Sequence, residues 1–189
     1  MKTWKSGGNR PRILFDMDDV VTNFMEHLLN IYNKRTKSDL KVTDIKGWDL
    51  TPYCTKDVYK IFQEDGFFLN IPEKKHSTSV LKELIESTKY DIYIVTACNR
   101  PEELSEKVKW FKKILPAFNT DRIIAIKEKH LIRGDLIIDD KVENLIECEP
   151  YMKCLLYDTP ANQYDEKFKR IRNLSELPGI LENLFYPEA

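Results

Sequence analysis

Short apolar runs separated by polar stretches are the dominant pattern of this chain. The runs are rich in Ile, Leu, Val and Tyr, and each ends at charged or small polar residues. This pattern is typical of short strands that a parallel sheet buries on both faces. We therefore predict five strands, at Ile13–Phe15, Asp91–Thr96, Arg122–Ile126, Asp135–Ile138 and Lys153–Tyr157.

Apolar residues recur at helical spacing between these runs. Strands that alternate with helices predict an α/β fold with a doubly wound, mostly parallel sheet. The helix that begins at Pro101 is expected to bury one apolar face, formed by Leu104, Val108, Phe111 and Leu115. The other helices are predicted at Val21–Arg35, Val58–Phe62, Val80–Ile85, Val142–Ile146 and Pro178–Phe185.

The chain between the first two strands is several times longer than a crossover connection needs. We therefore predict that residues 24–75 form a small helical cap. This cap is expected to be inserted into an α/β core domain of residues 11–23 and 76–189. The connection between the third and fourth strands is, by contrast, short for a crossover helix.

Composition and charge narrow the class of protein. Hydrophobic residues make up 42% of the chain and charged residues 32%, as in a globular domain. A net charge of -1 gives no basic field that would capture long nucleic acid, and no apolar stretch is long enough to span a membrane. The four cysteines show no C-x-x-C spacing, so we expect reduced thiols in a cytoplasmic protein.

The first strand ends in an acidic loop that contains Asp16, Asp18 and Asp19. In an extended chain Asp16 and Asp18 point the same way. Two carboxylates about 4 Å apart repel by about 4 kcal/mol at an effective dielectric constant near 20. A divalent metal ion between them would remove this repulsion, and the alternative is a solvated acidic turn after a core strand.

Polar residues also follow the other predicted strands. Thr96 ends the second strand, Lys129 follows the third, and Asp139 and Asp140 follow the fourth. Because ligands bind beyond the carboxyl ends of the strands in open α/β sheets, this set predicts a phosphate site with Mg²⁺. Simpler interpretations stay open: Thr96 closes a strand, the two aspartates cap a helix, and Lys127 competes with Lys129 as the phosphate ligand.

In order and spacing, these residues resemble the motifs of the haloacid-dehalogenase superfamily of phosphotransferases. The motifs are Asp16–Val20, Val95-Thr96, Lys129 and Asp135–Lys141, and the ten-residue step from Lys129 to Asp139 also agrees. Within the superfamily the chain is most similar to the 5'(3')-deoxyribonucleotidases. This closer similarity rests on Gly66-Phe67-Phe68, on Gly134–Asp140 and on the position of the predicted cap.

The resemblance implies a role for each motif residue. Asp16 is expected to be the nucleophile that forms an aspartyl-phosphate, and Asp18 is expected to be first the general acid and then the general base. Thr96 and Lys129 are expected to hold the phosphoryl oxygens. The expected ligands of Mg²⁺ are Asp16, the backbone carbonyl of Asp18 and Asp139, with Asp140 in support.

Three aromatic residues of the predicted cap are candidates to stack on a nucleobase, namely Trp48, Phe67 and Phe68. For Phe67 and Phe68 the alternative is packing in the core of the cap. The chain has Ala97-Cys98 where mammalian members of the family carry Ser-Pro, so this motif lacks the serine hydroxyl that could contact the phosphate. The resemblance does not identify which aromatics of the cap contact the base, so it does not decide the base preference.

We therefore predict a Mg²⁺-dependent phosphomonoester hydrolase, specifically a 5'(3')-deoxyribonucleotidase that acts on nucleoside monophosphates. One alternative is a phosphatase for another small phosphomonoester, such as a sugar phosphate. The other is a phosphate- or metal-binding module without catalysis, which would have no need of Asp18 as a proton shuttle. The resemblance also allows a homodimer.

Overall fold

A single six-stranded parallel sheet forms the centre of the computed structural model, which describes residues 10–187. The strand order is β3-β2-β1-β4-β5-β6. The predicted α/β class with a mostly parallel sheet is confirmed, and the two-residue β6 is the strand that the sequence pattern missed. The strands are β1 (Arg12–Phe15), β2 (Asp91–Thr96), β3 (Ile123–Ala125), β4 (Leu136–Asp139), β5 (Lys153–Tyr157) and β6 (Arg170–Ile171).

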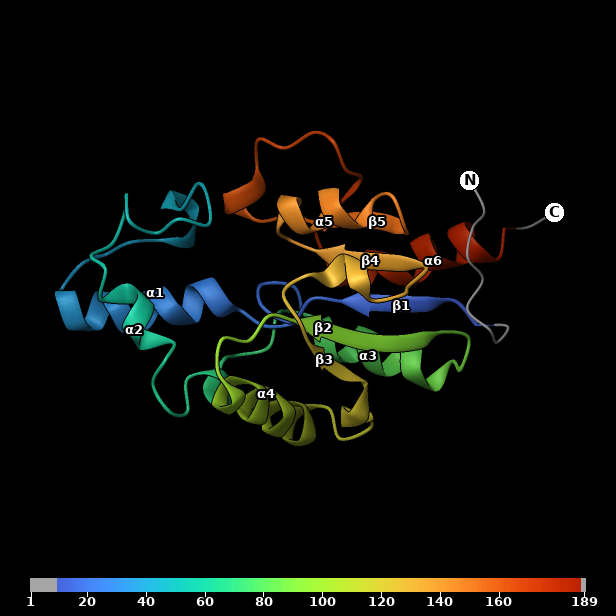
Figure 1. The fold of residues 1–189 in the computed structure, drawn as a ribbon, viewed down its shortest axis with the longest axis horizontal. Coiled ribbons are helices and arrows are strands. Elements are labelled where there is room, and N and C mark those ends of the chain that lie inside the picture. The colour runs from blue at the N-terminus through green and yellow to red at the C-terminus, as the bar shows by residue number, and fades with distance from the viewer. Residues whose placement is uncertain (1–9, 188–189) are drawn as a thin grey trace.

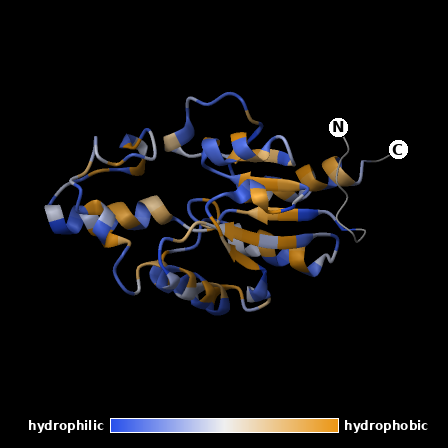
Figure 2. Cartoon of the chain, in the orientation of Figure 1, coloured by the Kyte–Doolittle hydropathy of each residue, from blue (hydrophilic) through white to orange (hydrophobic). Residues whose placement is uncertain are grey.

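Strand side chains alternate between the two faces of the sheet. Because the side chains on both faces are apolar, helices cover both faces. On one face Ile13 and Phe15 pack with α3 (Ser77–Glu86), α4 (Pro101–Ile114) and α6 (Leu177–Phe185). On the other face Leu14 packs with α5 (Val142–Cys148). Figure 2 shows the strands mostly in the hydrophobic colour, as expected for a sheet that is buried on both sides.

Residues 24–75 lie between β1 and α3 and have an apolar cluster of their own. They contain α1 (Phe24–Thr36), α2 (Val58–Ile61) and two 3₁₀ turns, η1 (Val42–Asp44) and η2 (Phe68–Asn70). In Figure 1 this segment lies beyond the carboxyl ends of the strands. Its buried apolar residues are Met25, Leu28, Leu29, Tyr32, Ile45, Leu50, Cys54, Val58, Ile61, Phe67, Phe68 and Ile71.

The predicted apolar face of α4 is wrong in part. Leu104 and Val108 are only half-buried, and the buried residues of this helix are Glu103, Lys107, Trp110 and Phe111. Both buried charges have polar partners: Glu103 accepts bonds from Asn99 and Arg100 just before the helix, whereas Lys107 pairs with Asp18 from the loop after β1. Ile146 of α5, the last residue of the predicted helix Val142–Ile146, is 47% exposed.

The short connection between β3 and β4 contains no α-helix, in agreement with its length. It holds one 3₁₀ turn, η4 (Lys129–Leu131). Ile126 and Ile132, on either side of this turn, pack against the apolar cluster below α5. In the described part of the chain, no helix combines the length and the apolarity needed to cross a membrane.

Candidate active site

The register of the sheet brings the predicted site residues to one edge. Phe15 of β1 lies opposite Ile138 of β4, and the Asp16 N–H donates to the Ile138 carbonyl at 2.9 Å. Asp16 comes directly after Phe15 and Asp139 directly after Ile138, so the two aspartates lie side by side. Phe15 also pairs with Ile94 of β2, two residues before Thr96. Thr96 and Asp139 end their strands and Asp16 directly follows β1, so all three polar residues lie at the same end of the sheet.

Lys129 bridges the two aspartates. The turn η4 carries it into the site, where only 3% of the residue is exposed. Its Nζ lies 2.6 Å from Asp16 Oδ1 and 2.6 Å from Asp139 Oδ2. Burial opposes the ammonium charge, but the two carboxylates outweigh it and raise the pKa of Lys129 well above its usual value. The competing residue Lys127 is exposed and lies at the wall of the site.

Three buried carboxylates form a cluster that fits a divalent cation. Oxygens of Asp16, Asp139 and Asp140 all lie within 4.8 Å of one another. Burial raises the pKa of Asp16 to about 7, although Lys129 opposes the shift. Burial and the neighbouring carboxylates raise the pKa of Asp140 well above its usual value. Within residues 10–187, Asp140 Oδ2 is buried without a hydrogen-bond partner, so its acceptor capacity is left for an ion.

The metal-free protein is expected to lose stability as the pH rises from about 4 to about 7. Carboxyls with raised pKa values keep their protons longer in the folded chain than in the unfolded chain. The folded state therefore binds more protons in this range, and the free energy of unfolding falls as pH rises. Asp140→Asn removes one of the buried charges. At pH 7 it should raise the melting temperature of the metal-free protein by about 2–8 °C, since about 1–2 kcal/mol corresponds to about 2–4 °C per kcal/mol.

Differential scanning fluorimetry in EDTA at pH 5 and pH 7 measures this effect. The matched control is Glu143→Gln, which removes an exposed carboxylate from the first turn of α5. The gain should be larger at pH 7 than at pH 5 for Asp140→Asn alone. An equal gain at the two pH values would contradict the assignment of a raised pKa to Asp140.

A cavity of about 370 Å³ opens over the cluster, within the range of small-molecule sites. Carboxylates lie in it together with lysines and aromatic side chains. Asp16 and Asp18 both line it, as expected from their spacing, whereas Met17 between them is buried in the core. The lining residues are Asp16, Asp18, Phe24, Trp48, Ala97, Lys127, Lys129, Asp140, Lys141 and Asn144.

Lys107 of α4 is a site residue that the sequence analysis missed. It is fully buried, and its Nζ lies 2.6 Å from Asp18 Oδ2 and 2.7 Å from Thr96 Oγ1. Thr96 is fully buried, and its hydroxyl accepts a bond from Lys107 and keeps its own proton to donate. A signal was available: Lys107 precedes Trp110 and Phe111 by three and four residues, which puts it on their face of the helix.

The three candidate aromatics separate into two groups. Trp48 lines the cavity, together with Phe24, which the sequence analysis did not single out. In the described structure Phe67 and Phe68 are not among the lining residues; each is 4% exposed within the cluster of residues 24–75. Phe67 packs edge-on against Phe24 with ring centroids 5.6 Å apart. The packing interpretation therefore accounts for both phenylalanines.

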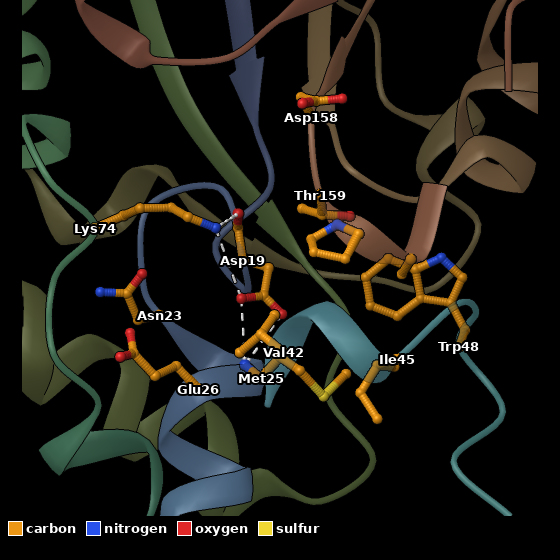
Figure 3. A pocket seen from close by; sticks show the side chains of 12 residues that line it. Asp19, Asn23, Met25, Glu26, Val42, Ile45, Trp48, Lys74, Asp158 and Thr159 are labelled. Carbon is orange, nitrogen blue, oxygen red and sulfur yellow. Dashed lines mark hydrogen bonds and ion pairs between the residues drawn. The ribbon is translucent and has the colours of Figure 1, made fainter. Parts of the chain in front are cut away.

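Asp19, the third carboxylate of the acidic loop, joins the two segments that lead into and out of residues 24–75. Its backbone has a positive φ of 56°, and its carboxylate accepts the Met25 N–H at the start of α1. Lys74 of the returning segment also contacts it (Figure 3). Burial raises the pKa of Asp19 to about 6, while Lys74 opposes the shift. Asp19 also lines a second cavity, of about 360 Å³, which shares Trp48 with the first. Figure 3 shows the side chains that line this second cavity.

Comparison with known proteins gives consistent results. The sequence model of one family, described as 5' nucleotidase, deoxy (pyrimidine), cytosolic type C, matches residues 10–183. A 5'(3')-deoxyribonucleotidase of Bacillus subtilis is 32% identical over 168 residues, which cover 87% of this chain and 95% of that protein. The cytosolic-type 5'(3')-deoxyribonucleotidase of Homo sapiens is 26% identical over 141 residues, which cover 69% of this chain and 70% of that protein.

Solved structures support the fold. A haloacid-dehalogenase (HAD) family hydrolase from Deinococcus radiodurans, with bound phosphate and sodium, superposes with a TM-score of 0.60 at 10% identity and covers 96% of this chain and 99% of its own. A HAD-hydrolase from Bacillus subtilis bound to magnesium gives a TM-score of 0.56 at 15% identity, over 92% of this chain and 99% of its own. The fold is therefore that of the haloacid-dehalogenase superfamily.

Proposed function

The chain belongs to the 5' nucleotidase, deoxy (pyrimidine), cytosolic type C family, and from this premise we propose that it hydrolyses deoxyribonucleoside monophosphates in the cavity at the strand ends. It is a phosphomonoester hydrolase of the nucleotidase type. The observation that carries the proposal for this site is one cavity that joins Asp16, Asp18 and Lys129 to the aromatic residues Phe24 and Trp48.

The proposed reaction has two steps, both at Asp16. An Asp16 oxygen attacks phosphorus and forms an aspartyl-phosphate, while Asp18 gives its proton to the sugar oxygen that leaves with the nucleoside. Asp18 then takes a proton from the water that attacks this intermediate, which releases phosphate and restores Asp16. Both residues line the same cavity, which supports the pairing of these roles.

Lys129 and Thr96 are proposed to bind the phosphoryl oxygens. Two of the three ammonium protons of Lys129 point to Asp16 and Asp139, and within residues 10–187 the third has no partner, so it can reach a substrate oxygen. The Thr96 hydroxyl accepts its bond from Lys107 and can donate its own proton. Charge-assisted bonds of this kind orient a dianionic phosphate for attack.

Mg²⁺ is the proposed cofactor. Its ligands would be Asp16, Asp139 and the backbone carbonyl of Asp18, with Asp140 in support. The clustered carboxylates and the unpaired Asp140 Oδ2 support this choice, since hard cations prefer oxygen ligands. When bound, the ion would neutralise charge on the phosphate and so allow a carboxylate to attack it.

Residues 24–75 are proposed to act as a cap over a core of residues 11–23 and 76–189, because they have their own apolar cluster and contribute Phe24 and Trp48 to the cavity. These two residues are proposed to stack on the nucleobase. We also propose that the enzyme acts on free nucleotides in the cytoplasm, since one similar human protein is a cytosolic-type enzyme.

Phosphate release from a substrate panel with Mg²⁺ tests the proposed function. The panel holds dUMP, dTMP, dGMP, UMP, 3'-nucleotides, several sugar phosphates and p-nitrophenyl phosphate. At least one deoxyribonucleotide should exceed every sugar phosphate about 10-fold or more in kcat/KM, since stacking contributes about 1–3 kcal/mol per base. A sugar phosphate as best substrate would overturn the substrate class, and no hydrolysis of any compound would favour a binding module.

Trp48→Ala provides the matched variant for the panel. In this variant kcat/KM should fall for the nucleotides but stay unchanged for p-nitrophenyl phosphate, because the reacting groups stay in place. Trp48→Phe keeps an aromatic face and should retain most of the nucleotide activity. Equal losses on both kinds of substrate would contradict a role of Trp48 in base binding.

A further inference from the structure

All three protons of the Lys107 ammonium point to protein oxygens. Besides Asp18 Oδ2 and Thr96 Oγ1, Nζ donates to the Ala97 carbonyl at 3.1 Å. An ammonium has only three donors, so none is left for a phosphoryl oxygen. Lys107 therefore differs from Lys129, which has a proton to spare. Its contacts are to the residue that handles the proton rather than to the phosphate.

The contact with Lys107 leaves one oxygen of Asp18 unbonded. Oδ2 is held by the ammonium, while Oδ1 is buried and has no hydrogen-bond partner in the described structure. A carboxylate without this anchor could rotate about its last bond and present either oxygen. The ion pair thus fixes the orientation of this carboxylate, which lines the cavity. Such orientation of an acid–base group is a large part of its catalytic effect.

The segment 66–69 of the cap covers this ion pair. The Phe68 ring lies over the Lys107 ammonium, with 4.6 Å between Nζ and the ring centroid. Glu106, the preceding residue of α4, accepts the backbone N–H groups of Gly66 at 2.5 Å, Phe68 at 3.0 Å and Leu69 at 3.3 Å. One turn further along, the Trp110 indole donates to the Ile71 carbonyl at 2.7 Å. Helix α4 therefore binds the cap with one residue and Asp18 with the next.

We infer that Lys107 is the positioning residue for proton transfer by Asp18, and that Glu106 and Phe68 make this action depend on a seated cap. The inference rests on the proposed function. In the first step the Asp16–phosphorus bond forms, the bond from phosphorus to the leaving oxygen breaks, and the proton of the Asp18 carboxyl passes to that oxygen. The contribution of Lys107 to kcat/KM should therefore be larger for a leaving group that needs a proton than for one that leaves as a stable anion.

The test compares two leaving groups in Lys107→Met. The value of kcat/KM covers the reaction up to departure of the leaving group. A deoxyribonucleoside needs a proton to leave, whereas p-nitrophenolate leaves as a stabilised anion. We expect kcat/KM to fall about 100-fold for dUMP and less than about 5-fold for p-nitrophenyl phosphate, since general acid catalysis contributes about 10²–10⁴-fold. Equal losses on both substrates would overturn the inference and leave Lys107 a structural or phosphate-binding role.

Two further variants make the result independent of folding defects. Lys109→Met changes an exposed lysine of the same helix and should behave as the wild type. Glu106→Gln leaves the Lys107–Asp18 pair in place and weakens only the hold on the cap. Its kcat/KM should fall about 10-fold for dUMP and much less for p-nitrophenyl phosphate. If Lys107→Met does not fold, this variant provides the test of the inference. An equal loss on both substrates for Glu106→Gln would overturn the coupling to the cap.

The outcome can be separated from that of the proposed function. If the wild type hydrolyses no nucleotide, the comparison is repeated with whichever sugar phosphate it does hydrolyse, because that leaving group also needs a proton. A selective loss there would support the role of Lys107 although the proposed substrate is wrong. No hydrolysis of any phosphomonoester by the wild type would overturn both.

Discussion

Asp16→Asn is expected to abolish nucleotide hydrolysis while the protein stays folded. The amide nitrogen and oxygen occupy the space of the carboxylate but do not attack phosphorus to form the aspartyl-phosphate. The loss should be at least about 10⁴-fold in kcat, the scale seen when a nucleophile is removed. The fold should persist because Asn has nearly the volume of Asp and replaces a carboxyl group whose pKa is raised to about 7 by burial.

Phosphate release and thermal unfolding, measured on the same preparation, check this result. Asp121→Asn, an exposed aspartate before β3, is the matched control and should leave both unchanged. Mass spectrometry of wild-type protein quenched in acid during turnover should find a phosphoryl group on the peptide that contains Asp16. Substantial phosphatase activity of Asp16→Asn would exclude Asp16 as the nucleophile.

The part of the site that lies at the strand ends could be predicted from the sequence. A buried parallel strand is a short apolar run, so its last residue is visible in the pattern, and the sheet register then brings together the residues that follow. Asp16 and Asp139 are adjacent for this reason. The short connection into β4 contains both Lys127 and Lys129, and the ten-residue step to Asp139, taken from the family resemblance, favours Lys129.

The part of the site on α4 could not be predicted in the same way. Apolar spacing alone favours a face through Leu104 and Val108, and both residues are only half-buried. The helix instead buries Lys107, whose charge is compensated by Asp18 from the loop after β1, a residue 89 positions away. A buried charge is acceptable only with its partner in place, and the partner comes from another element. Spacing within one helix contains no information about such a partner.

The aromatic residues of the cap show the same limit. Phe67 and Phe68 stand together in a motif of the family, yet both are buried by packing. Phe24 lines the cavity although it opens a helix that the sequence describes only as amphipathic. Which aromatic faces the substrate depends on how the cap is seated on α4. Glu106 contacts Gly66 and Phe68 of the cap, and no local sequence pattern indicates these contacts.

Removal of divalent metal ions by EDTA is expected to abolish activity, and added Mg²⁺ is expected to restore it. Without the ion, Asp16, Asp139 and Asp140 crowd together with only Lys129 between two of them, and a phosphate dianion would add further negative charge. Ca²⁺ should not restore turnover, because it prefers longer bonds and more ligands than Mg²⁺. Retention of full activity after EDTA, with no metal found by elemental analysis, would contradict the proposed metal site.

Asp139→Asn is expected to weaken metal binding while the protein stays folded. Asp139 Oδ2 pairs with Lys129, while Oδ1 accepts the Lys141 N–H at 2.9 Å, a bond that the Asn side-chain oxygen can still accept. The variant should therefore keep α5 in place and weaken Mg²⁺ binding by about 10-fold or more, so that higher Mg²⁺ concentrations recover part of the activity. Asp16→Asn should not be recovered at any Mg²⁺ concentration, because it lacks the attacking oxygen as well as a ligand. That difference in rescue distinguishes a residue that only binds the ion from the one that also forms the covalent bond.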